Sequence, residues 1–252
     1  MTCLSATTYY ILETLIMEKI NTGIEGFDKL VFGGLPKGRA YLVSGEPGTG
    51  KTIFLIQFLL EGLNNGEKCI YISIDEKPEH IISDAKELGW DLLPHLENGK
   101  LQIIDVTNYF SSVKHKDGGI INVEDIVKDI LGYVKKSEAK RLAIDPIAPL
   151  IFSDQLFENV VEYIRTLIFS IENNTDCTTL LTSYIPVGSE KVSCFGIEEF
   201  AASGIIVLKL ATVNHKRIRT IGIRKMRATK IDLTEYSFEI LSERGITLRQ
   251  PI

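Results

Sequence analysis

A glycine-rich stretch, Gly45 to Thr52, carries the residues best suited to chemistry in this chain of 252 residues. It reads Gly-Glu-Pro-Gly-Thr-Gly-Lys-Thr and fits the pattern G-x-x-x-x-G-K-[ST]. The backbone N–H groups of such a loop converge on phosphate oxygens, and glycine permits a close approach that a Cβ would block. Lys51 is expected to reach the β- and γ-phosphates, and Thr52 to bind Mg²⁺.

The sequence therefore predicts a nucleotide site whose members adjoin one another in the chain. The residues predicted to hold the nucleotide are Gly45, Glu46, Pro47, Gly48, Thr49, Gly50, Lys51, Thr52 and Ile53.

The loop has the setting that this pattern requires, because an apolar run over 40–43 precedes it and a helical segment over 53–60 follows. Further strands are predicted over 68–74, 101–106, 142–145 and 178–183. Helical periods over 78–88, 123–134 and 156–171 separate them. This alternation predicts an α/β fold with a mainly parallel sheet flanked by helices.

The pattern changes after residue 204. Strand-like runs over 205–210, 217–225 and 236–241 follow one another with no helical period between them. We expect antiparallel strands that extend one edge of the sheet, within a single domain over 17–252. Residues 1–16 are predicted to be a dispensable extension, with a docking helical arm over 9–16 as the alternative. The polar segment 109–119 is predicted to be a mobile loop.

Carboxylates follow two of the predicted strands. In a parallel sheet, ligands bind beyond the carboxyl ends of the strands. Asp145 is expected to bind Mg²⁺ there, although a turn residue before Pro146 is the simpler alternative. Asp75 or Glu76 could position and deprotonate a water molecule, and a solvated acidic loop is the alternative.

The hydroxyls of Thr182 and Ser183, at the end of another predicted strand, could sense the γ-phosphate or simply be buried.

A basic cluster occupies the C-terminal part of the chain. Alternation with apolar residues predicts that much of its charge lies on one face of a strand pair. A solvated face, a nucleic-acid patch, and cations supplied to a neighbouring subunit's phosphates are three open interpretations. The cluster consists of His215, Lys216, Arg217, Arg219, Arg224, Lys225, Arg227 and Lys230.

Composition limits the possible functions. The net charge of −5 gives the whole molecule no general attraction for nucleic acid. No apolar run approaches the ~18 residues of a membrane span, and the first residues lack a basic region before an apolar one. We therefore expect a cytoplasmic protein without membrane contact. The scattered cysteines and histidines disfavour a zinc site.

Several motifs, in order and at family spacing, resemble the RecA superfamily, and most closely its KaiC-like branch. Asp75-Glu76 falls where that branch has paired catalytic carboxylates, with aspartate in place of the first glutamate. Asp145 matches its Walker B aspartate, and Lys225-Met226-Arg227 resembles a K-x-R motif whose cations reach the adjacent subunit's nucleotide. The other matching segments are 22–28, 33–38, 45–52 and 195–200.

The resemblance implies a RecA-like phosphate-loop core and a Mg²⁺-dependent ATPase with slow turnover. It also implies a homo-oligomer, either a hexameric ring or a filament, with Lys225 and Arg227 acting in trans. Single-domain relatives include RadA paralogues, which are accessory to DNA recombination and repair. A role of that kind would involve single-stranded DNA, bound through the loop 184–194 and the basic cluster, and a RecA/RadA-type recombinase. The alternative is a signalling or regulatory ATPase scaffold without DNA binding.

Overall fold

The computed structural model describes residues 17–106, 123–147, 157–185, 189, 191–213 and 215–252. The predicted extension 1–16 and the predicted mobile loop 109–119 lie outside the described residues. No helix in the described part of the chain is long and apolar enough to cross a membrane.

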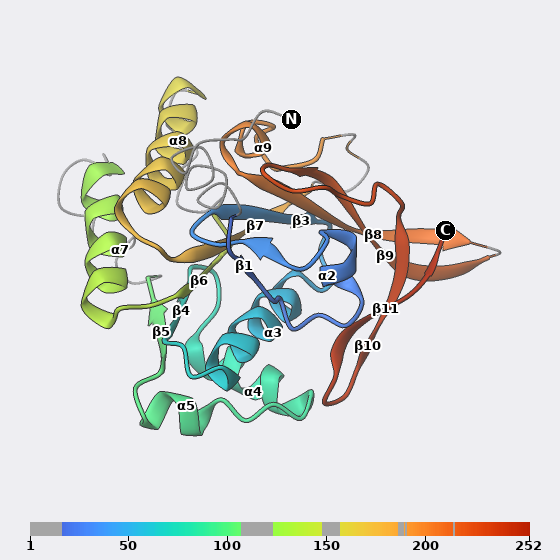
Figure 1. The fold of residues 1–252 in the computed structure, drawn as a ribbon, viewed down its shortest axis with the longest axis horizontal. Helices are drawn as coiled ribbons and strands as arrows, with labels where there is room; N and C mark the ends of the chain where they lie inside the picture. The colour runs from blue at the N-terminus through green and yellow to red at the C-terminus, as the bar shows by residue number, and fades with distance from the viewer. Residues whose placement is uncertain (1–16, 107–122, 148–156, 186–188, 190, 214) are drawn as a thin grey trace, which may run out of the picture.

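Within these ranges, one large sheet of nine strands forms the centre of the molecule, in the order β11-β10-β9-β8-β3-β7-β6-β4-β5 (Figure 1). A two-stranded sheet of β1 (Lys19–Ile20) and β2 (Leu35–Pro36) lies beside it. The strands of the large sheet are β3 (Ala40–Gly45), β4 (Cys69–Ser73), β5 (Leu101–Asp105), β6 (Arg141–Asp145), β7 (Thr178–Tyr184), β8 (Gly204–Val213), β9 (Lys216–Met226), β10 (Tyr236–Leu241) and β11 (Gly245–Pro251).

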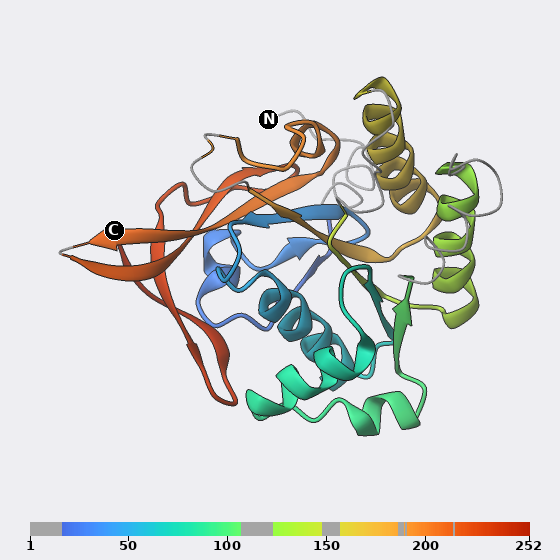
Figure 2. The same cartoon turned by 180° about the vertical axis from the view of Figure 1, so that it is seen from behind.

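Helices cover both faces of this sheet (Figure 2). Alternate strand residues divide between two cores, because successive side chains of a strand point to opposite faces. Leu42, Ile72 and Ile144 pack with α7 and α8, whereas Tyr41 and Val43 pack with α3 and α4. The helices are α2 (Phe27–Leu30), α3 (Lys51–Asn64), α4 (Pro78–Glu87), α5 (Leu93–Glu97), α7 (Val123–Ser137), α8 (Phe157–Asn174) and α9 (Glu198–Ala201).

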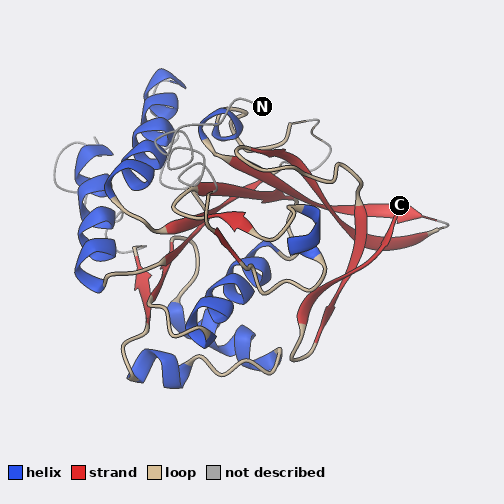
Figure 3. Ribbon diagram, viewed as in Figure 1, coloured by secondary structure: helices blue, strands red, loops and turns tan. Residues whose placement is uncertain are grey.

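The predicted α/β class is confirmed, with one correction at the C-terminal side. Strand β8 was expected to be antiparallel to the core but runs parallel to β3, with Leu42 opposite Ile205. The antiparallel part begins at β9, and the strands after it form the far edge (Figure 3).

Strand β11 was not predicted from the sequence. It pairs antiparallel with β10, and the buried amide of Gln57 on α3 holds it against the core. The Ile246 N–H donates to Gln57 Oε1 at 2.8 Å, and Gln57 Nε2 donates to the Arg244 carbonyl at 2.9 Å. A side chain on Gly245 would meet Gln57 and Trp90, so the turn into β11 requires glycine.

An ion pair between a buried arginine and a partly exposed glutamate joins β6 to the segment before β4, beside α3. Arg141 is 1% exposed, and its Nε donates to Glu67 Oε2 at 2.6 Å. Its Nη1 donates to the carbonyls of Asn21 and Phe58 at 2.8 and 2.9 Å, and the guanidinium lies 4.6 Å from the centre of the Phe58 ring. The buried guanidinium therefore has an anion, two carbonyls and an aromatic face as partners.

Removing this cation is expected to destabilise the fold strongly. Arg141→Ala leaves the Asn21 and Phe58 carbonyls and the partly exposed Glu67 without their partner and opens a void, which should lower the free energy of unfolding by about 2–5 kcal/mol. Lys68→Ala is the matched control, because the Lys68–Glu138 pair is exposed and should contribute at most about 1 kcal/mol. Urea unfolding measures both variants. Equal losses of unfolding free energy in the two variants would contradict the stabilising role assigned to Arg141.

Candidate nucleotide site

The phosphate loop connects the last residue of β3 to the first turn of α3. Gly48 and Gly50 have φ of 78° and 105°, conformations that favour glycine. A Cβ on Gly45 would lie 2.5 Å from the Leu208 carbonyl oxygen. These three glycines therefore keep the loop tight against β8 and leave its N–H groups free of side-chain cover. Helix α3 begins at Lys51, two residues earlier than expected, so the predicted phosphate cradle sits at its N-terminus.

Asp145, at the end of β6, gathers hydroxyls from three elements. Thr52 Oγ1 donates to Asp145 Oδ2 at 2.7 Å, and Tyr71 Oη donates to the same oxygen at 2.7 Å. Thr182 Oγ1 donates to the other carboxylate oxygen. The sequence predicted Thr52 and Asp145 as a pair of Mg²⁺ ligands, and the fold brings them into direct contact. Tyr71 was not predicted, because nothing in the sequence distinguishes it from the other buried residues of an apolar strand.

The residues at this position fit a magnesium ion. Mg²⁺ prefers hard oxygen ligands, and it commonly takes one or two protein oxygens together with substrate phosphates. Thr52 and Asp145 supply a hydroxyl and a carboxylate beside the phosphate loop. Thr182 holds the carboxylate from its other oxygen, which fixes the direction in which Asp145 presents its ligand atom.

Lys51 folds back over the phosphate loop. Its Nζ donates to the carbonyls of Gly45 and Glu46 at 2.8 and 3.0 Å. Burial lowers the pKa of Lys51, and the nearby Asp145 opposes that shift. Because the ammonium rests on carbonyls of the loop itself, it lies beside the place where phosphates are expected.

A cavity of about 490 Å³ adjoins the loop, and Glu76 lies in its wall together with Lys51 and Thr52. Burial raises the pKa of Glu76, and the carboxylates of Asp84 and Asp145 raise it further. Asp75 is more exposed than Glu76, and partial loss of solvent, with the Asp145 carboxylate as the smaller cause, raises the pKa of Asp75 as well. Of the two predicted bases, Glu76 is the one that lines the cavity.

Arg219, a member of the predicted basic cluster, lines the same cavity. Its Nε donates to the Gly48 carbonyl at 3.2 Å, so a cation from β9 reaches the phosphate loop within one chain. The sequence placed Arg219 only in the cluster. The signal available was its period-two relation to Ile221 and Ile223, which pack on the same side as α3.

Removing Arg219 is expected to weaken nucleotide binding. A charge-assisted hydrogen bond contributes about 1.5–3 kcal/mol, so Arg219→Ala should weaken ADP binding by roughly 10-fold or more. Arg217→Ala, on an exposed residue of the same strand, is the control and should leave affinity unchanged. Calorimetric titration with ADP measures both. Unchanged affinity in Arg219→Ala would mean that this arginine only braces the Gly48 carbonyl.

The alternation predicted that much of the basic cluster lies on one face of the strand pair, and this prediction is wrong. Ile205 is opposite Lys225 and Ile206 is opposite Ile223, so Arg224 is the extra residue of a β-bulge. The bulge reverses the alternation. As a result Lys225 and Arg227 leave the face that carries Arg219.

Lys225 and Arg227 stand together at α9, away from the phosphate loop of their own chain. Lys225 Nζ donates to the carbonyls of Ala202 and Glu199 at 2.7 and 2.9 Å, and Arg227 Nη2 donates to the Phe200 carbonyl at 3.3 Å. By strand register they are level with the first half of β3, whereas the loop begins after its last residue. The structure brings these two cations together but does not bring them to the cavity.

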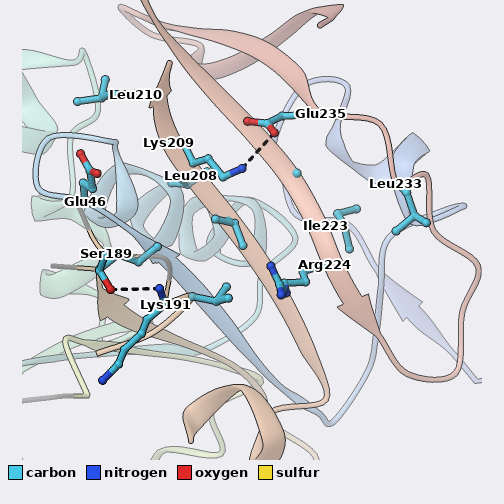
Figure 4. A pocket seen from close by; sticks show the side chains of 14 residues that line it. Glu46, Ser189, Lys191, Leu208, Lys209, Leu210, Ile223, Arg224, Leu233 and Glu235 are labelled. Carbon is cyan, nitrogen blue, oxygen red and sulfur yellow. Dashed lines mark hydrogen bonds and ion pairs between the residues drawn. The ribbon is translucent and has the colours of Figure 1, made fainter. Parts of the chain in front are cut away.

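Figure 4 shows a second cavity, of about 420 Å³, which shares Glu46 with the phosphate loop. Lys191 lines it from the segment that follows β7, and Arg224 lines it from β9. Lys209 Nζ and Glu235 form an ion pair of 3.2 Å across it. The side chains that line this cavity therefore include both positive and negative charges.

Comparison with known proteins agrees with this geometry. A family model described as "ATPase: KaiC" matches residues 20–251. The circadian clock protein KaiC3 of Synechocystis sp. is 32% identical over 240 residues, and a UPF0273 protein of Thermotoga maritima is 30% identical over 241 residues. These alignments cover 94% and 92% of this chain, but 46% of the clock protein and 96% of the Thermotoga protein. The chain thus spans less than half of the clock protein's length.

A solved structure has the same fold. A KaiC-like protein from Pyrococcus horikoshii superimposes with a TM-score of 0.80 at 33% identity, over 93% of this chain and 100% of that one. Fold and site together define a phosphate-loop ATPase domain with a RecA-like core. The chain belongs to the KaiC family of ATPases.

Proposed function

We propose that this protein is a Mg²⁺-dependent ATPase that hydrolyses ATP to ADP and phosphate. The observation that carries the proposal is the 2.7 Å contact between Thr52 and Asp145 beside the phosphate loop. This contact joins the two predicted ligand atoms of a metal–nucleotide complex, although they lie far apart in the sequence. Membership of an ATPase family supports the same reaction.

The chain's residues would divide the work as follows. The loop N–H groups and Lys51 bind the phosphates, and Thr52 and Asp145 hold Mg²⁺, which when bound neutralises charge on the phosphate oxygens. Glu76 lines the cavity and orients the attacking water, with Asp75 as the neighbouring alternative. Such catalysis consists mostly of positioning and electrostatics, so slow turnover is expected when the active site is incomplete.

The test of this function is ATP hydrolysis by the purified full chain, with and without Mg²⁺. Release of phosphate that requires Mg²⁺ is the expected result, and the mass of the oligomer should be measured on the same sample. A folded protein that neither binds nor hydrolyses ATP in Mg²⁺ would contradict the proposal.

The catalytic base can be identified by isosteric substitution. Glu76→Gln removes the carboxylate that lines the cavity and should lower kcat by about 10²-fold or more, with nearly unchanged nucleotide affinity. Asp75→Asn, on the exposed neighbour, is the matched control and should have a smaller effect. The pKa of Glu76 is raised above its ordinary value of 4.5, and a general base acts only when it is deprotonated. As the pH is lowered, wild-type activity should therefore fall at a pH that is still above 4.5. A larger loss in Asp75→Asn would reverse the assignment.

Two uses of the hydrolysis remain as proposals. A RadA-paralogue-like role in DNA recombination would require single-strand binding, and Lys191 and Arg224 in the second cavity are the cations that favour it. A signalling or regulatory scaffold is the alternative, and relatives named as circadian clock proteins favour it. Phosphate contacts make DNA binding fall steeply with salt. Salt-dependent binding of single-stranded DNA that stimulates hydrolysis would support the first role, and no binding at low salt would exclude it.

A further inference from the structure

The C-terminal end of β7 presents two adjacent hydroxyls to opposite faces of the sheet. Thr182 points toward α3 and donates to Asp145. Ser183 points the other way, and both residues are fully buried. From the sequence, either hydroxyl could sense the γ-phosphate or simply be buried, and the fold places only Thr182 at the Asp145 carboxylate. Ser183 therefore has another role.

Ser183 is bound to a buried carboxylate on α9. Its Oγ donates to Glu198 Oε1 at 3.0 Å and accepts from the Cys194 N–H at 3.0 Å. Glu198 is 0% exposed, and its two oxygens also accept from the N–H groups of Phe195 and Ile197 at 3.2–3.3 Å. Within the described residues no ion pair involves Glu198. A buried carboxylate without a cation is costly, so these donors must hold it in place.

The segment 192–197, which contains these N–H donors, is hydrogen-bonded to β3 immediately before the phosphate loop. Ser44, which pairs with Ser183 in the parallel register, donates its hydroxyl to the Val192 carbonyl. The Ile185 N–H donates to the Gly45 carbonyl at 3.1 Å. The segment 192–197 thus closes over one face at the end of the sheet, and the metal carboxylate lies on the other.

We propose that Glu198 is a positioning residue for the Mg²⁺–nucleotide centre, acting through Ser183 and Thr182 on Asp145. By fixing Ser183, Glu198 fixes the direction of Thr182, the preceding residue of β7. The Thr182 hydroxyl in turn orients the Asp145 carboxylate. This inference rests on the proposed function, since it gives Glu198 a part in holding the ion that hydrolysis needs. It also assigns a role to a residue that does not line the cavity beside the phosphate loop.

The experiment compares Glu198→Gln, Ser183→Ala, their double variant and the wild type in the full chain. Glutamine keeps the volume but replaces one acceptor with a donor that faces N–H groups. Glu97→Gln, an exposed carboxylate on α5, is the matched control. Each protein is assayed for kcat, for the Mg²⁺ concentration that gives half-maximal hydrolysis, and for ADP affinity with and without Mg²⁺.

Both single variants should lower kcat about 10-fold and raise the half-maximal Mg²⁺ concentration by a similar factor, as expected for partners that orient a metal ligand. ADP affinity without Mg²⁺ should stay within about twofold, which a general loss of structure would not allow. The double variant should be no worse than the poorer single variant, because the two residues act as one unit. Faster amide exchange over 192–197 in Glu198→Gln should accompany these changes.

Variants that melt cooperatively and keep the wild-type Mg²⁺ requirement would overturn the proposal. If Glu198→Gln does not fold, Ser183→Ala decides, because it removes a single hydroxyl. If the wild type binds ADP with Mg²⁺ but hydrolyses nothing, the proposed function fails and the Mg²⁺-dependence of ADP binding still tests Glu198. If no variant alters that dependence, the positioning role is wrong.

Discussion

Replacing Lys51 with alanine is expected to abolish detectable ATP hydrolysis while leaving the fold intact. Lys51 is the only residue of the loop pattern that carries a full positive charge to the β- and γ-phosphates. Its ammonium contacts only carbonyls of the loop itself among the hydrogen bonds of the described residues, so the core does not depend on it. Hydrolysis, ADP affinity and the melting temperature should be measured together.

Lys37→Ala provides a matched control for the loss of one lysine. Lys37 forms an exposed ion pair with Glu18 at 2.8 Å and lies outside the cavity lining. It should hydrolyse ATP at the wild-type rate. A folded Lys51→Ala protein with unchanged turnover would show that the phosphate loop is not the hydrolytic site.

The second large effect concerns an active site shared between subunits. We expect Lys225→Ala/Arg227→Ala to lower kcat by about 10³–10⁵, the contribution of a cation delivered to the γ-phosphate, or about 4–7 kcal/mol. Within one chain the pair is level with the start of β3 and cannot serve the loop at its end. A neighbouring subunit in a ring or filament is therefore the expected recipient.

Mixing two inactive proteins tests this prediction. Lys51→Ala supplies intact cations, and Lys225→Ala/Arg227→Ala supplies an intact phosphate loop, so some interfaces in mixed oligomers are complete. Activity should reappear after subunit exchange has been shown. A chain with all three substitutions is the control, since its mixture with Lys51→Ala contains no intact loop. Exchange without recovery would mean that the cations only satisfy the carbonyls of α9.

The parts of the site that follow from local sequence could be predicted. The phosphate loop is contiguous, and Asp145 follows an apolar strand, so spacing alone selects both. A parallel sheet then requires strand ends to meet at one edge. The structure places Thr52, Asp145 and Thr182 in one hydrogen-bonded group at that edge.

The remaining features depend on register. Arg219 reaches the Gly48 carbonyl only because of how β9 pairs with β8, and the bulge at Arg224 moves Lys225 to the opposite face. Alternation shows that Thr182 and Ser183 face opposite sides, but not which of them meets the metal carboxylate. Strand β11 contains a terminal proline and depends on the distant amide of Gln57, which no local pattern reveals.

The position of β3 in the sheet limits the order in which this protein can fold during translation. Its two neighbours are β7 and β8, and both are made long after β3 during translation. When the phosphate loop has been synthesised, the strands that pair with β3 on either side have therefore not yet been made. The phosphate loop therefore has both neighbouring strands only after the chain has been synthesised through β8, so we expect nucleotide to stabilise the nascent chain from that point onward and not before.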